Sequence, residues 1–220
     1  MQKFPKVFLY LISFCFLSSC TPKVSQSLKP AGENFRQEQV RFFTEDTSES
    51  MVYKTNLEYR NQNFSSLVYL KKTDDHTFSM VLTTAFGNTM LEGTFSKQGF
   101  VFKNVVSYLN RKPLLDLLEH DWRLLLRGNL FNDTPQVYSD SAQLTVYHFN
   151  DVKTTSLYYY SQGKGTVEMI ESYSGKTKKA IISIARMPPK SPEGISIEHP
   201  GMDLKIEMVR LKVASDDSVE

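Results

Sequence analysis

Cysteine is almost absent from this sequence. The 220-residue chain has two cysteines, Cys15 and Cys20, and both lie within its first twenty residues. Because Cys15 falls in a segment that we expect to be removed, Cys20 would be the one cysteine left, which excludes an intramolecular disulfide and a cysteine-based metal site. The domain must then obtain its stability from a hydrophobic core, and the 201 residues from Cys20 onward are enough for one.

The chain also lacks a large excess of either basic or acidic residues. The chain carries 26 Lys and Arg against 24 Asp and Glu, a formal net charge of +2. Loss of the first 19 residues removes Lys3 and Lys6 but no acid, so basic and acidic residues become equal in number. A chain without a basic surplus gives no electrostatic reason to expect a nucleic acid partner.

No run of apolar residues is long enough for a permanent membrane helix. The longest, Val7–Leu17, has eleven residues, follows two lysines and precedes small residues, which is the pattern of a secretion signal. The sequence LSSC that ends at Cys20 resembles the lipobox of bacterial lipoproteins, in which the signal is cleaved and the cysteine is acylated. We therefore expect a lipoprotein signal peptide at 1–19 and a lipid anchor on Cys20. The alternative is an ordinary cleaved signal in which Cys20 is incidental.

The expected anchor also predicts a location. One acyl chain holds a protein only marginally to a bilayer, at about 0.8 kcal/mol per buried methylene, but a lipobox cysteine normally receives more than one chain. Thr21 is not the aspartate that some bacteria use for inner-membrane retention, so the outer membrane is favoured. We expect a lipid-anchored domain that faces the periplasm and is a monomer.

Polar segments flank the predicted domain. Residues 20–50 are rich in Ser, Gln, Glu and Lys, which indicates a tether. Apolar residues interrupt its later part: Phe35, Val40, Phe42 and Phe43. They predict a short helix near residues 33–43 that docks on the domain. Residues 214–220 form an acidic tail that we expect to be disordered.

Short segments rich in Val, Tyr, Phe and Thr dominate residues 51–213. They predict strands at 51–60, 64–71, 77–84, 89–96, 99–105, 143–149, 155–161, 165–172, 179–185, 194–198 and 203–213. Consecutive short strands with tight turns form antiparallel meanders. After Pro113, leucines recur at helical spacing and predict an amphipathic helix that ends before Gly128.

Together these elements predict a mainly β fold with helices (α+β). The sheet would be strongly curved and antiparallel, with about 10–11 strands in a half-open β-barrel. One face is apolar, because Phe78, Met80 and Leu82 alternate with smaller or more polar residues. The helix either completes the core on this face or roofs a cavity, and the pattern allows both.

An aromatic residue lies at a predicted hairpin tip. The stretch TAFGNT at residues 84–89 follows a predicted strand, and Gly87-Asn88 is a turn signal, so Phe86 lies close to water. A partly buried residue that folds back on the sheet is the plain explanation, since single exposed apolar residues are common.

The order of these features resembles a known family. A lipobox, a tether, a meander containing FSMVLTTAFGNTMLEG, a helix and a final DLKIEM strand are similar to the outer-membrane lipoprotein receptor LolB and its periplasmic relative LolA. The resemblance covers about residues 51–213. It implies an incomplete antiparallel barrel in which helices form a lid over an apolar cavity.

The resemblance also implies a function. Receptors of this family accept acylated lipoproteins from a soluble periplasmic carrier and release them into the outer membrane. They carry an exposed apolar residue before a glycine on a loop that follows an early strand, and Phe86 and Gly87 match that position. We therefore expect Phe86 to be a membrane wedge. The cargo would be acylated lipoproteins or related lipids, with no cofactor and no metal.

Acyl chains would occupy the cavity without covalent bonds, with a gain that grows with each methylene removed from water. The expected walls come from the sheet and the helix: Phe78, Met80, Leu82, Phe100, Phe102, Leu114, Leu118 and Trp122. Methionine suits such walls because its side chain adapts to variable shapes.

Two other classes of function compete with lipid transfer. An enzyme is disfavoured, because the four histidines have no metal-site spacing and no Gly-x-Ser-x-Gly motif is present. A structural or assembly lipoprotein that binds a protein partner in the envelope is the second alternative. Tyr158, Tyr159 and Tyr160 place aromatics on both faces of one strand, as an interface would require, although a cavity on one face also explains them.

Overall fold

The computed structural model describes residues 28–31, 35–43, 46–48, 50–140, 144–185 and 191–211. Three expectations from the sequence lie outside these residues: the signal peptide at 1–19, the lipidation site Cys20 and the tail at 214–220.

Thirteen strands of the described chain form one antiparallel sheet, in the order β1-β7-β8-β9-β10-β11-β12-β13-β2-β3-β4-β5-β6. They are β1 (Lys29–Pro30), β2 (Ser50–Tyr59), β3 (Gln62–Asp74), β4 (Thr77–Thr84), β5 (Thr89–Ser96), β6 (Gly99–Val105), β7 (Gln136–Ser139), β8 (Thr145–Asn150), β9 (Thr155–Ser161), β10 (Thr166–Ser174), β11 (Thr177–Ala185), β12 (Gly194–His199) and β13 (Leu204–Leu211). Two meanders, β2 to β6 and β7 to β13, join where β13 pairs with β2. The first and last strands of the predicted domain therefore meet in the middle of the sheet.

Most strands lie where the sequence pattern predicts them, and β4, β5, β6 and β9 have the predicted bounds. The predicted number of about 10–11 strands is wrong, because β1 and β7 bring the sheet to thirteen. These two strands have two and four residues and pair with each other, Lys29 opposite Ser139. Segments this short carry no readable alternation, so only the pairing itself identifies them.

The helix α2 (Lys112–Leu130) begins as predicted, with Pro113 in its first turn. Its predicted end before Gly128 is wrong, because the helix continues through Gly128 for two more residues. The glycine has a packing role. A Cβ atom at residue 128 would lie 2.2 Å from the carbonyl oxygen of Val40, so a side chain there would collide with backbone.

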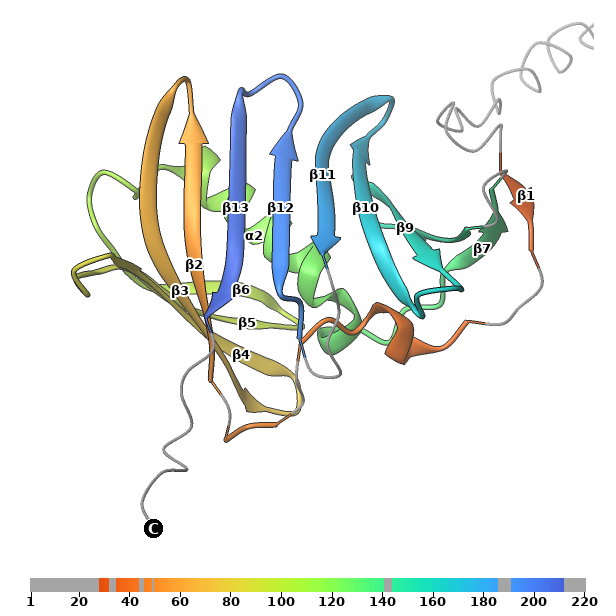
Figure 1. The fold of residues 1–220 in the computed structure, drawn as a ribbon, viewed down its shortest axis with the longest axis horizontal. Coiled ribbons are helices and arrows are strands. Elements are labelled where there is room, and N and C mark those ends of the chain that lie inside the picture. Colours follow the sequence, from red (N-terminus) through yellow and green to blue (C-terminus); the bar gives the residue numbers. More distant parts are fainter. Residues whose placement is uncertain are drawn as a thin grey trace, which may run out of the picture.

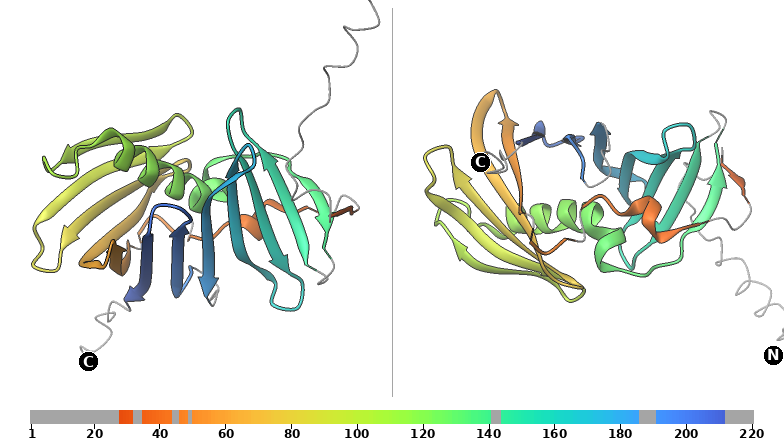
Figure 2. Two further views of the ribbon diagram at one scale, coloured as in Figure 1. Left: turned by 90° about the horizontal axis from the view of Figure 1, so that it is seen from above. Right: turned by 60° about the horizontal axis from the view of Figure 1, so that its bottom comes forward.

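The sheet is open and strongly curved, and α2 crosses its concave side (Figures 1 and 2). The two edge strands, β1 and β6, do not pair with each other, so the described strands do not close into a barrel. A short 3-10 turn, η2 (Gln37–Val40), lies beside the C-terminal end of α2 (Figure 2). The main core lies on the concave side, between sheet and helix.

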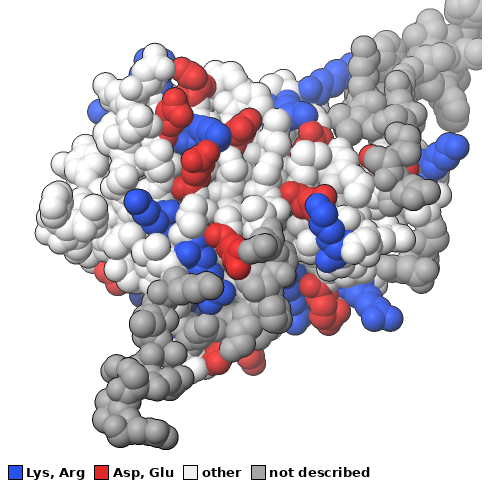
Figure 3. Space-filling model, in the orientation of Figure 1, with Lys and Arg blue, Asp and Glu red and all other residues white. Residues whose placement is uncertain are grey.

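The convex face carries mixed charge. Figure 3 shows Lys and Arg interspersed with Asp and Glu over the face formed by β2, β13 and β12. Cross-strand register explains part of this pattern, because Lys205 lies opposite both Glu58 and Glu198. This face therefore presents no field of a single sign.

A second, smaller core lies at strands β8 to β10. Val146, Leu157 and Tyr173 are buried there, away from the main core. Beside them, the carboxylate of Glu171 accepts hydrogen bonds from the hydroxyl groups of Tyr159 (2.9 Å) and Tyr173 (2.7 Å) and from Lys178. Burial would raise the pKa of Glu171, but the bonds from Lys178 and the two tyrosines lower it. The hydroxyl groups of Tyr159 and Tyr173 thus have hydrogen-bond partners within the domain.

Candidate functional site

The helix divides the concave side of the sheet into two ends. Residues 121–130 of α2 are buried except for the partly exposed Arg123, whereas residues 112–120 are partly buried or exposed. We call the region around the buried half the closed end and the region around the other half the open end.

The closed end is filled by residues 35–43, which we call the strap. Val40, Phe42 and Phe43 are at most 3% exposed and belong to the main core. The ring of Phe43 lies 6.1 Å from that of Trp122 on the helix and 6.5 Å from that of Phe78 on β4. The strap therefore joins helix and sheet with aromatic contacts, as expected for a segment docked on the domain.

The strap also satisfies the C-terminal end of α2, where backbone carbonyls have no partner within the helix. The side chains of Gln37 and Arg41 both donate to the carbonyl oxygen of Gly128, at 2.9 and 3.1 Å. In return, the side-chain amide of Asn129 donates to the carbonyl oxygen of Phe43 at 3.1 Å. These bonds fix the strap at the one helical position that lacks a side chain.

A buried pair links the helix to the sheet. Asp121 Oδ2 and His199 Nε2 are 3.0 Å apart, and the other ring nitrogen of His199 lies 3.1 Å from the carbonyl oxygen of Lys179. Burial raises the pKa of Asp121. Burial would lower the pKa of His199, but its bond to Asp121 raises it. The pair therefore retains a proton between its two members, which reduces the cost of burying a charge.

Further polar groups hold the helix, and the first of them is His120, the last residue of the other half. His120 Nε2 lies 2.9 Å from the hydroxyl oxygen of Ser172, and Tyr158 donates to the carbonyl oxygen of Leu124 at 2.8 Å. Burial lowers the pKa of His120, so its ring is neutral. The guanidinium of Arg127 binds Asp133 and Asp151. Arg127 and Ser172 are buried, whereas Asp133 and Asp151 reach Arg127 from the surface.

The open end is lined by apolar side chains that keep part of their surface in water. They pack against the main core from the sheet, the loop before the helix and the helix itself: Leu57, Tyr59, Leu82, Phe102, Val105, Leu109, Leu115 and Leu118. Within the described chain, residues 112–118 of the helix make no side-chain hydrogen bond or ion pair to the sheet. The bond of Lys112 to Asp116 lies within the helix at its surface.

The eight expected cavity walls divide between the two ends. Phe78, Met80, Phe100 and Trp122 are buried in the main core. Leu82, Phe102 and Leu118 are partly buried beside it, and Leu114 is partly buried at the start of the helix. The structure thus brings four of these residues together as packed core and leaves the other four toward the open end.

Phe86 lies at the tip of the β4–β5 hairpin and is 94% exposed. The turn holds it there. The amide of Gly87 donates to the carbonyl oxygen of Thr84 at 3.0 Å, and Gly87 adopts a φ of 85°, which favours glycine. The ring does not fold back on the sheet, so the plain explanation of a partly buried hairpin residue does not hold.

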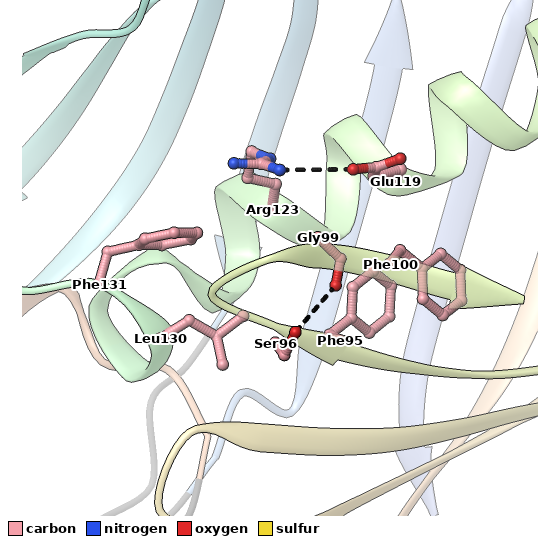
Figure 4. A pocket seen from close by; sticks show the side chains of 8 residues that line it. All are labelled: Phe95, Ser96, Gly99, Phe100, Glu119, Arg123, Leu130 and Phe131. Carbon is pink, nitrogen blue, oxygen red and sulfur yellow. Dashed lines mark hydrogen bonds and ion pairs between the residues drawn. The ribbon is translucent and has the colours of Figure 1, made fainter.

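A pocket opens between the β5–β6 hairpin and the helix (Figure 4). It is partly open to solvent, and its interior has room for about one water molecule. Its lining is Phe95, Ser96, Gly99, Phe100, Glu119, Arg123, Leu130 and Phe131. Of these residues, Phe100 alone is among the eight walls expected from the sequence. Phe95 shares an inward face with Leu91 and is recognisable from strand alternation, whereas Phe131 follows the helix and has no periodic signal.

Metal chemistry and membrane spans have no support in the described residues. They contain no group of three or more His, Cys, Asp or Glu side chains placed to hold a metal ion. None of their helices combines the length and hydrophobicity that crossing a bilayer requires.

Comparisons with known proteins give a likeness of fold. No family model matches this chain, and no curated protein matches its sequence. The crystal structure of a LolA superfamily protein from Nitrosomonas europaea superposes with a TM-score of 0.54, at 7% identity, over 80% of this chain and 89% of the other. An outer membrane lipoprotein-sorting protein domain from Vibrio parahaemolyticus gives a TM-score of 0.44 at 6% identity, over 84% and 91% of the two chains.

The first of these likenesses covers four fifths of this chain. At 7% identity this likeness shows a shared fold, and it gives no information on the role of any single residue. The protein therefore has a LolA-like fold, a curved and open antiparallel sheet with a helix on its concave side.

Proposed function

We propose that this protein binds acyl chains at the open end of its concave face and transfers acylated lipoproteins, or related lipids, to the bacterial outer membrane. The observation that carries the proposal is the set of partly buried apolar side chains packed against the main core, together with residues 112–118 of the helix, whose side chains make no polar contact with the sheet in the described chain. Such a surface gains free energy when a hydrocarbon chain covers it, at about 25 cal/mol per Å² of apolar area removed from water.

In this proposal the first half of α2 is a lid. Leu114 and Leu118 would move outward to admit a chain, while the closed end keeps the helix attached through Asp121 and the strap. The role is binding and transfer without catalysis, and the polar groups of the closed end serve to hold the lid.

Phe86 is the proposed membrane wedge, and the geometry of the chain restricts how it reaches a membrane. Lys29 lies nine residue steps after the expected anchor at Cys20, which gives a reach of about 30 Å at most. Strand β1 and the β4–β5 hairpin lie toward opposite ends of the long axis (Figure 1). Phe86 therefore contacts the anchoring membrane when the long axis lies along the membrane surface.

The same proposal includes an envelope location, a soluble periplasmic carrier that would deliver cargo, and a monomeric state.

The protein-scaffold alternative loses its main support, because each of the three tyrosines has a contact within the domain. Tyr158 bonds to the helix, Tyr159 bonds to Glu171, and Tyr160 packs against Tyr147.

Native mass spectrometry on the Cys20→Ala protein tests the proposal. The protein is mixed with a purified acylated lipoprotein or with the same lipoprotein lacking its acyl chains, and we expect a complex with the acylated form alone. Equal binding of both forms, or binding of neither, would contradict acyl recognition and favour the scaffold.

The wedge is tested separately by release of bound cargo into liposomes. Phe86→Glu should leave uptake unchanged and slow release. Val152→Glu is the matched control, because Val152 is fully exposed on the β8–β9 loop. Equal release rates for Phe86→Glu and the control would remove Phe86 from the mechanism.

A further inference from the structure

Exposed apolar side chains in the described loops gather at one edge of the sheet. Successive turns of an antiparallel meander alternate between its two edges, so the β2–β3, β4–β5, β6–α2, β8–β9 and β12–β13 connections share one edge. Their large exposed apolar residues are Phe86, Tyr108, Val152 and Met202. The described turns of the opposite edge, β3–β4, β5–β6 and β9–β10, contain none. Apolar residues that collect at one edge indicate a contact surface, whereas scattered ones need no explanation.

The β2–β3 hairpin and the β12–β13 turn lie side by side at this edge. The amide of Arg60 donates to the carbonyl oxygen of Asp203 at 3.3 Å. Met202, which directly precedes Asp203, is 47% exposed. Phe64, near the start of β3, is 52% exposed and lies opposite Leu57 of the open end. Directly opposed residues of neighbouring strands share a face, so Phe64 lies on the concave side, next to the open end.

The β4–β5 hairpin continues this row. Ser66 of β3 lies opposite Thr84 of β4, where the pairing of the two strands ends. Phe64 and Phe86 each lie two residues beyond that pair, toward the edge. The two aromatic residues therefore belong to adjacent chain segments that leave the sheet at the same point.

The β6–α2 loop completes the row. The amide of Val106 donates to the carbonyl oxygen of Met90 at 3.0 Å, which holds the loop beside the start of β5. Tyr108 in this loop is 59% exposed. The loop and the two hairpins lie toward the same end of the long axis (Figures 1 and 2). We define the rim as the exposed apolar residues of this row: Phe64, Phe86, Tyr108 and Met202.

The rim borders the open end of the concave face. Strand ends that lead into its loops carry residues of the open end, Tyr59 in β2 and Val105 in β6. Leu109, another residue of the open end, lies in the β6–α2 loop itself. A surface that contacts the rim therefore also comes next to the open end.

The charges of the rim loops favour an anionic lipid surface. Arg60 and Arg111 lie in these loops against one acid, Asp203. An arginine at a membrane interface keeps its apolar stem against hydrocarbon while its guanidinium binds phosphate groups. Tyrosine also suits this interface, because its ring is apolar and its hydroxyl group is polar.

The arrangement of the rim favours a bilayer over a protein partner. Its side chains come from separate loops, which also contain polar residues such as Asn61, Asn88 and Asn110. A protein interface has a closely packed core, whereas the boundary layer of a membrane admits apolar side chains without a matching shape. The expected lipid anchor at Cys20 would also hold the domain at a membrane.

We propose that the rim docks on an anionic lipid bilayer, with its four apolar side chains in the headgroup layer and with Arg60 and Arg111 at the phosphates. This inference rests on the membrane contact of Phe86 in the proposed function and extends that contact from one residue to four loops. Docking by the rim places the open end against the membrane surface. An acyl chain then passes between protein and bilayer with little exposure to water.

Sedimentation with vesicles of phosphatidylcholine and phosphatidylglycerol tests the rim. The Cys20→Ala protein is used without cargo, so neither the anchor nor an acyl ligand contributes to binding. A triple variant, Phe64→Ser with Tyr108→Ser and Met202→Ser, keeps Phe86 and the charge of the parent. Its partition coefficient should fall by about tenfold or more, since burial of even one such side chain contributes a factor of this size.

A matched triple variant controls for the loss of exposed apolar surface. Val101→Ser, Val152→Ser and Val209→Ser change residues that are each at least 58% exposed and lie outside the rim. Val152 belongs to the same sheet edge but lies beside the closed end, where its neighbour Asp151 binds Arg127. This variant should bind vesicles as the parent does. Thermal melting checks that both triple variants are folded.

A labelling experiment covers the case in which the rim triple variant does not fold. Phe64→Cys, Tyr108→Cys and Met202→Cys are made one at a time in the Cys15→Ala, Cys20→Ala protein and labelled with a fluorophore that brightens in apolar surroundings. Vesicles should increase the emission at each of these positions. They should leave the emission of labelled Val152→Cys unchanged.

The outcomes separate this inference from acyl binding. Equal vesicle binding by the parent and the rim triple variant, an equal loss in both triple variants, or unchanged emission at the three labelled rim positions would overturn the rim. No vesicle binding by the parent would also overturn it and would leave these loops to a protein partner. Acyl recognition is measured independently by native mass spectrometry with acylated lipoprotein, so either result can fail while the other holds.

Discussion

The two halves of α2 carry the same number of leucines in very different surroundings. Leu114, Leu115, Leu117 and Leu118 of the first half are partly buried, whereas Leu124, Leu125, Leu126 and Leu130 of the second half are at most 3% exposed. Leucine content therefore does not decide which half is fixed. The second half is held by the strap and by buried polar bonds. In the first half, His120 bonds to Ser172, but residues 112–118 make no polar side-chain contact with the sheet within the described chain.

This difference has a consequence for ligand entry. Opening the closed end would break hydrogen bonds and leave buried polar groups without partners, at about 1–3 kcal/mol for each group. Opening the open end exposes apolar surface that an acyl chain can cover again. The first half of the helix can therefore move away from the sheet while the second half stays in place.

The largest expected effect is the loss of the buried pair. Asp121→Ala should lower the free energy of unfolding by about 3–5 kcal/mol, because His199 loses its partner in the protein interior. Asp116→Ala on the exposed face of the same helix should cost about 0.5 kcal/mol or less. Urea denaturation of both variants measures the difference. Similar midpoints for the two would show that the closed end is not held by this pair.

Truncating one leucine in each half gives the next largest contrast. Leu125→Ala should cost about 2–5 kcal/mol, as is typical for a cavity in a packed core. Leu114→Ala should cost about 1 kcal/mol or less, since its side chain is already partly in water. Thermal unfolding of both variants compares them directly. A cost for Leu114→Ala as large as that for Leu125→Ala would mean that the open end is packed like the core.

The smallest of these effects concerns the contact between strap and helix. Gly128→Ala should lower the free energy of unfolding by about 1–3 kcal/mol through collision with the backbone of Val40, although alanine alone favours a helix by about 1 kcal/mol. Gly163→Ala is the control, because nothing lies within 4 Å of a Cβ atom there. Stabilisation by Gly128→Ala in urea denaturation would contradict the close approach.

Local patterns were sufficient for most of the sheet. The strands β4, β5 and β6 were predictable because alternating side chains and turn residues such as Gly87 are set by neighbouring positions. The same patterns marked Phe35, Phe42 and Phe43 as a segment that docks on the domain. The end of the helix was not predictable, because Gly128 normally indicates a helix terminus and its actual role depends on a contact with residue 40.

The chemical character of the candidate site was predictable from the sequence, but the contacts that position it were not. The apolar faces of sheet and helix follow from periodicity, so the apolar composition of the concave face could be predicted from the sequence. The partners of Asp121 and His120 were not, because His199 and Ser172 lie 78 and 52 residues away along the chain. On the helix pattern alone, such residues belong to a polar surface.

The sequence by itself determined the local features of this protein: the β-rich class, the position of most strands, the helix start and the turn that holds Phe86 at a hairpin tip. Each of these depends on residues within a few positions of one another. Only the tertiary structure decided that one half of α2 is buried and the other partly open. That difference depends on the strap and on His199, which reach the helix from distant parts of the chain, and long-range pairing of this kind leaves no periodic trace in the sequence.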